Sequence, residues 1–471
     1  MDREGQTLSR ATEDFPQHFP KPGWVEHDPE EIWRSVERSV ARALGDQFGP
    51  RVAAIGITNQ RETSLLWDRS SGRAVHPAIV WQDRRTADRC LELRAGGHLE
   101  LVRAKTGLVL DPYFSGTKLE WLLRNVAGVR DAAVAGQLAF GTIDSYLVWK
   151  ITGGAHVTDV TNASRTLLMD LASCEWAPEM LELLSVPQAV LPTIVASAGV
   201  IGTTKSFAGL RDGIPIAGIA GDQQAALFGQ GCFSPGEVKC TYGTGAFVLS
   251  NIGASPKPSS AGLLTTVAWR LGNDTTYAHE GSSFVAGAAV QWLRDGLGLI
   301  RSAAEIEPLA RSVSESGGVV FVPALAGLGA PHWDPEARGL LCGLTRGTTA
   351  AHIARAVLEG IAFSVADLLD AMGAVTPLKR MRVDGGAAAN SLLMQLQSDI
   401  SCITIERPKE LESTARGAAM LAGVGAGLFG SPTEALAMSR TEHTFTPEMS
   451  PDDRNGAKRR WSSAIARARL P

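Results

Sequence analysis

Residues 217–224 read AGIAGDQQ and place Asp222 just past a predicted strand, where a helix begins. Ligands of open α/β folds gather at this end of the sheet, and a carboxylate there can act as a general base or contact a metal. Asp222 is also suited to cap the following helix, since aspartate side chains accept the first amide protons of helices. The chemical role and the capping role can coexist, and both stay open on this stretch alone.

A second predicted strand ends at the polar residues of 56–64, GITNQRETS, in which Arg61 and Glu62 are adjacent. A guanidinium group donates hydrogen bonds in a planar fork, and a carboxylate accepts them. The pair therefore suits a small polyol, whose hydroxyl groups both donate and accept. The alternative is a surface ion pair, which would contribute little to stability.

Two turns rich in glycine could bring backbone amides to a phosphate group. Residues 239–250, KCTYGTGAFVLS, predict a hairpin with a Gly-Thr-Gly tip between two β-prone runs. Residues 382–395, RVDGGAAANSLLMQ, predict a strand, a Gly385-Gly386 turn and a helix. Glycine lets a ligand approach the backbone, and a helix N-terminus favours phosphate. Either stretch can also be no more than a tight turn.

Other nucleotide and metal motifs are excluded by the sequence. It contains no P-loop pattern, Gly-x-x-x-x-Gly-Lys-Ser/Thr, and no His-Glu-x-x-His or Cys/His ligand spacing for zinc. One Gly-x-Gly-x-x-Gly string occurs at Gly425, Gly427 and Gly430, but it ends a helical run. A dinucleotide fingerprint follows a strand and opens a helix, so we interpret this string as close packing and a helix C-cap.

Composition restricts the class of protein further. The 471 residues are 44% hydrophobic and 20% charged, which allows two or more domains with ample cores. A net charge of −4 disfavours a nucleic-acid binder. The six dispersed cysteines indicate free thiols in a reducing compartment. No apolar run approaches the roughly 20 residues of a membrane span, and residues 1–10 lack a signal-peptide core, so we expect a cytoplasmic protein.

Strands and helices alternate along the chain and must position these polar residues. Strands are predicted at 51–58, 214–221, 317–325 and 378–386, and long helices at 29–48 and 350–372. This alternation predicts an α/β architecture with mainly parallel strands. The turn-forming residues 231–236, GCFSPG, indicate a boundary between a domain of residues 1–231 and a domain of residues 232–471.

Long motifs give the sequence a family resemblance. Residues 113–125, YFSGTKLEWLLRN, and 339–359, GLLCGLTRGTTAAHIARAVLE, resemble the two signatures of the FGGY carbohydrate kinases. Stretches that resemble the glycerol kinases of this family lie, in order, at 20–33, 53–63, 78–87, 108–118, 159–170, 218–230, 241–251 and 327–339. The resemblance implies a two-domain, actin-like ATPase fold of ribonuclease H-like type, with the active site in the interdomain cleft.

The resemblance also implies an activity and a set of site residues. The expected reaction is phosphorylation of glycerol by ATP to sn-glycerol 3-phosphate in glycerol catabolism, with Mg²⁺, by a homodimer or homotetramer. Asp222 resembles the base that takes the proton of the attacking hydroxyl, and it is a candidate contact of Mg-ATP. Residues that resemble glycerol contacts are Arg61, Glu62, Tyr113, Asp222 and Gln223, with Trp81 and Phe247 as apolar walls. Residues that resemble nucleotide contacts are Gly243, Thr244, Gly287, Gln291, Ala303, Gly386 and Asn390.

The start of the sequence departs from the family pattern. That pattern opens with a further strand and an Asp-x-Gly-Thr loop, and no Asp-x-Gly-Thr occurs in this sequence. We therefore expect the chain to lack roughly 15–25 residues, including phosphoryl donors each worth about 10²–10³ in rate. Either the full product begins further upstream and is an ordinary family member, or this chain is an impaired glycerol- or nucleotide-binding remnant. A kinase for another polyol or a ketose is a third alternative.

Overall fold

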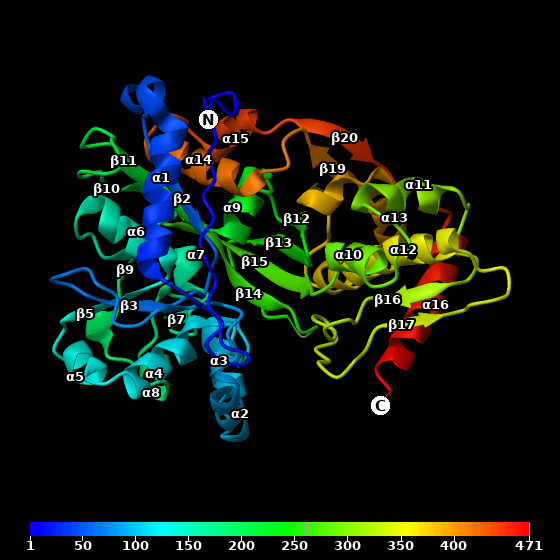
Figure 1. Cartoon of the computed structure of the whole chain (residues 1–471), viewed down its shortest axis with the longest axis horizontal. Helices are drawn as coiled ribbons and strands as arrows, with labels where there is room; N and C mark the ends of the chain where they lie inside the picture. Colours follow the sequence, from blue (N-terminus) through cyan, green and yellow to red (C-terminus); the bar gives the residue numbers. More distant parts are fainter. Residues whose placement is uncertain (260, 471) are drawn as a thin grey trace.

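A ten-stranded mixed sheet runs through the molecule and joins its two lobes (Figure 1). The computed structural model describes residues 1–259 and 261–470, the side chains of residues 46–48 and 50 excepted. The strands of the sheet, in spatial order, are β2 (Ile55–Asn59), β11 (Pro215–Gly221), β10 (Ala198–Thr203), β14 (Leu264–Leu271), β15 (Asp274–Ser283), β13 (Ala246–Gly253), β12 (Glu237–Tyr242), β18 (Arg380–Asp384), β19 (Ile405–Pro408) and β20 (Thr441–Phe445).

The prediction of mainly parallel strands is wrong. Four neighbouring pairs of this sheet are parallel, namely β2–β11, β10–β14, β12–β18 and β18–β19. The other five pairs are antiparallel. The cause is local, because β12–β13 and β14–β15 are hairpins, and short turns can join only antiparallel strands. The β12–β13 hairpin is the one predicted from residues 239–250.

Helices cover both faces of the first lobe. Helix α1 (Pro29–Phe48) and helix α6 (Ile143–Thr152) pack on β2 and β11 through a core that includes Ile57 and Ile216. The opposite face is covered by α9 (Asp222–Gly229) and α14 (Ser413–Gly425), which pack with Ala220 and Leu421 in a separate core. Helix α14 lies late in the sequence and yet packs on strands of the first lobe.

The second lobe is built around α12 (Ala350–Gly373), whose apolar face packs into the largest core of the molecule. Its predicted bounds, 350–372, agree with the structure, as do those of α1. Other helices of this lobe are α10 (Gly287–Asp295), α11 (Ile306–Arg311), α13 (Ser391–Ser401) and α16 (Pro451–Ala468), with η3 (Ala303–Glu305) and η4 (Gly386–Ala389). Helix α15 (Pro432–Ala435) and η5 (Leu436–Met438) instead pack against α14, where Ala435 and Met438 join the first-lobe core that contains Ala220.

Short elements complete the fold. The first lobe holds α2 (Ala87–Ala95), α3 (Leu99–Thr106), α4 (Ser115–Asn125), α5 (Val129–Val134), α7 (Val160–Ala163) and α8 (Pro178–Leu183), with η1 (Gly49–Arg51) and η2 (Gln188–Val190). Five two-stranded sheets are β1 (Glu26–His27) with β4 (Ala78–Ile79), β3 (Leu65–Asp68) with β5 (Leu138–Gly141), β6 (Val157–Asp159) with β9 (Thr193–Val195), β7 (Met169–Asp170) with β8 (Glu175–Trp176), and β16 (Val320–Val322) with β17 (Leu340–Cys342).

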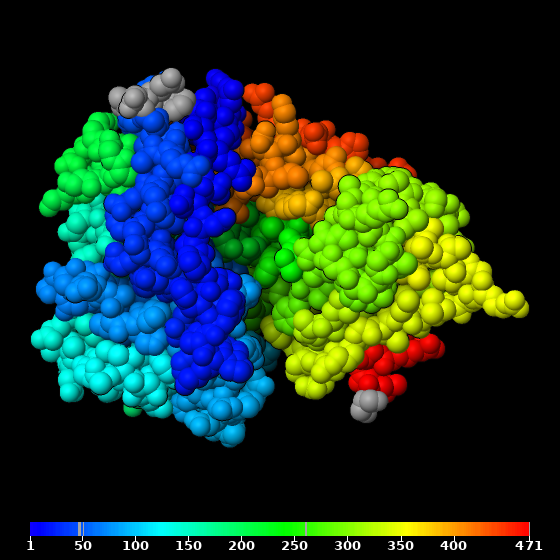
Figure 2. All heavy atoms as spheres, viewed as in Figure 1, coloured from blue at the N-terminus to red at the C-terminus, as the bar shows by residue number. Residues whose placement is uncertain are grey.

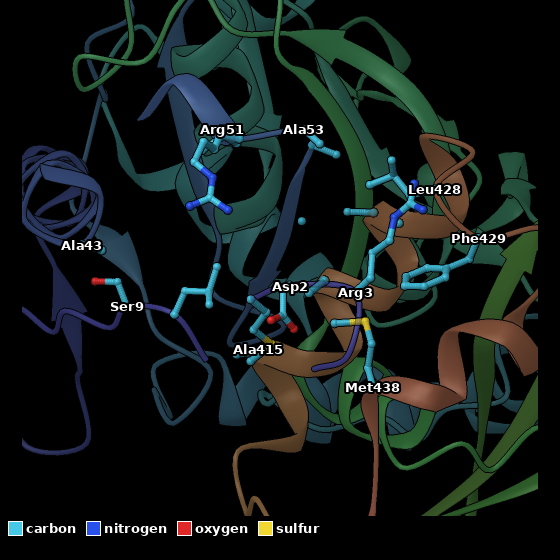
Figure 3. A pocket seen from close by; sticks show the side chains of 18 of the residues that line it. Asp2, Arg3, Ser9, Ala43, Arg51, Ala53, Ala415, Leu428, Phe429 and Met438 are labelled. Carbon is cyan, nitrogen blue, oxygen red and sulfur yellow. The ribbon is translucent and has the colours of Figure 1, made fainter. Parts of the chain in front are cut away.

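Strand β2 forms one end of the large sheet, and a cavity of about 540 Å³ lies beside its outer edge. Figure 3 shows Ala43 of α1 on the left of this cavity and Phe429 on its right, with Arg51 above and Ala415 of α14 below. Asp2 and Arg3 of the N-terminal segment also line it. Within the described residues, β2 pairs with β11 alone.

The lobes enclose a hollow, which Figure 2 shows between the blue N-terminal residues and the yellow-green second lobe.

Among the helices of residues 1–259 and 261–470, none combines the length and the apolar character that a membrane span requires. All six cysteines carry free thiols, and four of them are buried.

Candidate active site

Asp222 lies where β11 ends and α9 begins. Gly221 is the N-cap and Asp222 is the first residue of the helix, so the predicted capping role is wrong by one position. One carboxylate oxygen, Oδ1, accepts the backbone N–H of Gln223 at 2.8 Å, and the other accepts that residue's side-chain Nε2 at 3.0 Å. The side chain is 34% exposed, which leaves it accessible to a ligand.

The strand beside β11 places Arg61 and Glu62 next to Asp222. Both side chains are 2% exposed, so the alternative of a surface ion pair is wrong. Arg61 Nε lies 3.3 Å from Asp222 Oδ1 and 3.8 Å from Glu62 Oε1. Position 221 requires glycine, because a Cβ there would lie only 2.6 Å from Arg61 Cγ. The close passage of the two strands thus depends on this glycine.

Two charged residues that we did not predict complete this cluster. Glu280 of β15 accepts hydrogen bonds from Arg61 Nη1 at 2.6 Å and Nη2 at 2.9 Å. Arg165, which follows α7, donates to Glu62 at 2.7 Å and to Glu280 at 3.1 Å. Arg165 lies in the stretch 159–170 that carries part of the family resemblance, and Glu280 lies inside a strand. A lone carboxylate within a strand was the signal that could have drawn attention to Glu280.

The buried charged cluster consists of the guanidinium groups of Arg61 and Arg165 and the carboxylates of Glu62 and Glu280. Burial by itself would raise the pKa of Glu280, but Arg165 and Arg61 outweigh it and lower this pKa to about 2. The donors of Arg61 all face protein groups, including Gln224 at 3.2 Å and Tyr113 at 3.4 Å. The long contact to the Tyr113 hydroxyl is the one that a substrate hydroxyl can most readily replace.

A cavity of about 600 Å³ adjoins this cluster. Its lining includes the predicted substrate residues Trp81, Tyr113 and Phe247, together with Glu280 and Thr244. The rings of Trp81 and Tyr113 meet edge to face, with centroids 5.4 Å apart. Aromatic walls of this kind suit the carbon chain of a small ligand, while the charged cluster supplies polar partners.

The remaining predicted substrate residues lie beside this cavity and do not line it. Arg61 and Glu62 are buried behind Tyr113 and Glu280, to which Arg61 is hydrogen-bonded. Gln223 is 9% exposed and contacts Asp222. The structure therefore brings all seven predicted substrate residues into one region, in which three form the cavity wall and four form the polar group next to it.

A second cavity, of about 540 Å³, gathers the residues predicted to bind nucleotide. All seven line it: Gly243, Thr244, Gly287, Gln291, Ala303, Gly386 and Asn390. Two glycines make close contacts that exclude a side chain. A Cβ on Gly287 would lie 2.6 Å from the carbonyl oxygen of Gly243, and one on Gly385 would lie 2.5 Å from that of Tyr242. That the seven lining residues bind a nucleotide stays a prediction.

The Gly-Thr-Gly tip of the β12–β13 hairpin separates the two cavities, and Thr244 lines both. The amides of Ala286 and Ala288 donate to the carbonyl oxygen of Thr244 at 2.8 and 3.0 Å. The start of α10 therefore holds the tip in place. A group that extends from one cavity to the other must pass Thr244.

The expected phosphate site at the helix after Gly385-Gly386 stays a prediction, and the amides that would bind it already have partners within the chain. That helix, α13, has Asn390 as its N-cap, with Oδ1 accepting the amide of Leu393 at 2.9 Å. Glu307 accepts the amides of Ser391 and Leu392 at 3.0 and 3.2 Å. The first amides of this helix therefore have side-chain acceptors, and a phosphate would have to replace Glu307 to reach those of Ser391 and Leu392.

The role of Asp222 as a magnesium contact stays a prediction. The described residues contain no group of three or more His, Cys, Asp or Glu side chains able to hold a metal ion. Mg²⁺ commonly keeps several waters and binds through one or two carboxylates together with substrate phosphates. A single, partly exposed carboxylate such as that of Asp222 is compatible with that mode.

Comparison with known proteins identifies the family. The model of the N-terminal domain of the FGGY family of carbohydrate kinases matches residues 1–229, and the model of its C-terminal domain matches residues 238–426. The chain belongs to the FGGY family of carbohydrate kinases. The family resemblance inferred from the motifs is therefore confirmed.

Full-length relatives narrow the comparison within the FGGY kinases. A glycerol kinase of Myxococcus xanthus is 59% identical over 477 residues, covering 99% of this chain and 96% of the relative. One from Alkalilimnicola ehrlichii is 56% identical, with 99% and 94% covered. The structure of Plasmodium falciparum glycerol kinase with ADP matches with a TM-score of 0.94 at 36% identity, covering 100% of this chain and 95% of that one. The two-domain, actin-like kinase fold is thereby confirmed.

Proposed function

We propose that this FGGY kinase transfers the terminal phosphoryl group of ATP to glycerol, giving sn-glycerol 3-phosphate, with Asp222 as the general base. Glycerol is the substrate named for the relatives of 52–59% identity. A xylulose kinase of Rhodospirillum rubrum shares the fold with a TM-score of 0.84 but only 26% identity. The degree of similarity therefore favours glycerol over a ketose.

The observation that carries the proposal is the pair of cavities that meet at Thr244. One contains all the predicted nucleotide residues, and the other adjoins the charged cluster around Asp222. Phosphoryl transfer depends on positioning two substrates and stabilising charge more than on covalent help from the protein. A shared wall between a nucleotide cavity and a polyol cavity supplies that positioning.

Asp222 is suited to accept the proton of the attacking hydroxyl group. Its carboxylate is held by Gln223 and faces the Arg61 guanidinium at 3.3 Å, so its orientation is restricted. Trp81 and Phe247 can pack against the carbon chain of glycerol, because both line the substrate cavity. Tyr113, with its hydroxyl near Arg61, can exchange its long hydrogen bond for one to a glycerol hydroxyl.

The nucleotide side relies on backbone more than on charged side chains. Gly243, Thr244 and Gly287 form a narrow wall in which a side chain at Gly287 would clash. Mg²⁺ bound with ATP would neutralise charge on the phosphates, and a contact between Asp222 and this ion stays a prediction. Assembly as a homodimer or homotetramer stays a prediction.

The test is an Asp222→Asn variant assayed for sn-glycerol 3-phosphate formation, with Asp295→Asn as a matched control on the exposed end of α10. We expect kcat of Asp222→Asn to fall by about 10²–10⁴-fold, since general bases contribute rate factors of that size. The control should keep the kcat of the unsubstituted chain. A kcat within tenfold of that value in Asp222→Asn would refute the role of Asp222.

The substrate is tested separately on the unsubstituted chain. Glycerol, xylulose and gluconate are compared by kcat/KM at fixed Mg-ATP. We expect glycerol to give the highest value, because a pocket built around buried polar partners rejects analogues that leave those partners unpaired. A higher kcat/KM for the ketose or the sugar acid would overturn glycerol as substrate.

A further inference from the structure

A buried lysine, Lys239 of β12, lies behind Asp222 and has no role in the function proposed so far. Its side chain is fully buried. The ammonium group donates to Gln223 Oε1 in a short hydrogen bond and to Thr241 Oγ1 at 3.0 Å. Both acceptors are uncharged oxygens. Burying an ammonium group whose direct hydrogen-bond partners are neutral is costly.

The chemistry of lysine determines how Gln223 is oriented. An ammonium group has only donors, whereas a glutamine amide has an oxygen that accepts and a nitrogen that donates. With Oε1 turned to Lys239, the amide nitrogen must face the other way, and Nε2 indeed donates to Asp222 Oδ2 at 3.0 Å. The reverse orientation would place two donors together and an amide oxygen against a carboxylate.

Strand alternation puts Lys239 at this position. Lys239 and Thr241 point to one side of β12, toward α9, while Cys240 and Tyr242 point into the apolar core on the other. Asp384 is paired with Thr241 across the β12–β18 ladder. The lysine therefore lies between Asp222 on one neighbouring element and Asp384 on another.

Charges from every side act on this lysine. Asp384 of β18, Asp222 of α9 and Glu280 of β15 are of opposite sign, Arg61 is of the same sign, and the Cys240 thiol is adjacent. Asp384 is 2% exposed, and its Oδ1 has no hydrogen-bond partner within the described residues. Lys239 is thus the cation that faces an otherwise under-satisfied carboxylate and the far side of the Asp222–Gln223 pair.

The consequence for Asp222 concerns its remaining acceptor site. A carboxylate offers about four lone-pair positions. Gln223 N–H and Arg61 Nε face Oδ1, and Gln223 Nε2 faces Oδ2. One position, on Oδ2, is left for a substrate hydroxyl. If the amide of Gln223 turned over, Oδ2 would lose its donor and the carboxylate would lose its fixed direction.

We propose that Lys239 is a positioning residue, which holds the Gln223 amide in the one orientation that donates to Asp222. It thereby directs the free lone pair of Asp222 toward the substrate. This inference rests on the proposed role of Asp222 as the base.

The first test is Lys239→Met, which keeps most of the volume and removes the donor. We expect kcat to fall by at least about tenfold, because small misplacements of reacting groups cost up to about 10²-fold. We also expect the acid limb of the kcat–pH profile to move to higher pH by about one unit, since the Asp222 carboxylate loses a stabilising donor. The KM for ATP should change little.

Lys105→Met is the matched control, because Lys105 pairs with Asp170 and Glu179 on the first lobe and is 32% exposed. It should leave both kcat and the acid limb unchanged. A Lys239→Met protein that unfolds at lower temperature but keeps the kcat and the acid limb of the unsubstituted chain would show a merely structural lysine and overturn the proposal.

Gln223→Glu tests the same idea if Lys239→Met does not fold. It retains Lys239 and replaces the amide donor with a second carboxylate beside Asp222. Two adjacent carboxylates raise one pKa strongly, so we expect the acid limb to move up by more than one unit. An unmoved acid limb would overturn the proposal.

The inference and the proposed function can fail separately. An Asp222→Asn variant that keeps the full kcat would show that Asp222 is not the base. Lys239 would then have no base to position. A large loss in Asp222→Asn with no change of the acid limb in Lys239→Met and Gln223→Glu would refute only the role of Lys239.

Discussion

Glu280 is the residue on which the charged cluster depends. Its carboxylate accepts from two guanidinium groups, those of Arg61 and Arg165, and lies on a strand that the family model of the C-terminal domain includes. The two arginines and Glu62 belong to the part matched by the N-terminal model. One buried carboxylate thus joins the two sequence domains at the substrate site.

Glu280→Gln keeps the shape of the side chain and removes its charge. We expect unfolding free energy at pH 7 to fall by about 3–5 kcal/mol, because two buried guanidinium groups then share the charge of one carboxylate. Urea unfolding of both proteins measures the difference. A loss below about 1 kcal/mol would show that the cluster contributes little.

The pH dependence of that difference follows from the lowered pKa of Glu280. This pKa is about 2 in the folded protein, against an ordinary value of 4.5. A depressed folded pKa contributes stability that is complete above the unfolded value and is lost as pH falls toward the folded one. The difference between the two proteins should therefore be constant from about pH 7 to pH 5 and shrink steadily below about pH 4.5.

At the scale of elements, the position of Asp222 depends on how closely two helices approach. Helix α9 begins with Asp222 and packs on α14 through glycines. A Cβ on Gly417 would lie 1.8 Å from the carbonyl oxygen of Ala225, and one on Gly229 would lie 2.2 Å from that of Ser413. The Gly425 of the Gly-x-Gly-x-x-Gly string lies equally close to Ala217, which agrees with the prediction of close packing.

Gly417→Ala should therefore push α9 away from α14. We expect a loss of about 1–3 kcal/mol in unfolding free energy from overpacking, together with a lower kcat because Asp222 moves with its helix. Gly456→Ala is the matched control, since it lies within α16 with its nearest atoms at 3.7 Å. There alanine should stabilise by up to about 1 kcal/mol through helix propensity. Equal effects of the two substitutions on stability would contradict this account.

At the scale of the whole molecule, two cavities meet at one threonine. The nucleotide cavity lies in the second lobe, and the substrate cavity lies between the hairpin tip and the aromatic residues Trp81 and Tyr113 of the first lobe. The β12–β13 hairpin stands at the centre of the ten-stranded sheet, between β15 and β18. A turn in this position is held on both sides by strands, so it can present Thr244 to both ligands rigidly.

The assignment of the two cavities is tested by a reciprocal pair of substitutions. Gly287→Ala places a Cβ 2.6 Å from Gly243 in the nucleotide wall, and Trp81→Ala removes an aromatic wall of the substrate cavity. We expect Gly287→Ala to abolish the rise in Tm caused by ADP and to keep the rise caused by glycerol, since ligands stabilise only the folded state they bind. Trp81→Ala should do the opposite. Loss of both responses in either variant would contradict separate sites.

Much of the site could be predicted from sequence because its local parts are encoded locally. The hairpin around Gly243, the strand before Asp222 and the helices at 29–48 and 350–372 depend on residues near one another in the chain. The seven nucleotide positions came from the family resemblance, and the structure gathers them in one cavity. Strand direction was predicted wrongly, because only the hairpin at 239–250 was recognised and the β14–β15 hairpin was not, although both insert antiparallel pairs into the sheet.

The sequence by itself determined the turns, the principal helices and the family, since each depends on short-range spacing or on motifs read in order. Only the tertiary structure decided that Glu280, Arg165 and Lys239 join the site. Partners far apart in sequence meet because of strand order and register, which no local pattern specifies. The same holds for Asp222: its place at the end of a strand is visible in eight residues, but the amide that orients it is fixed by a lysine on another strand.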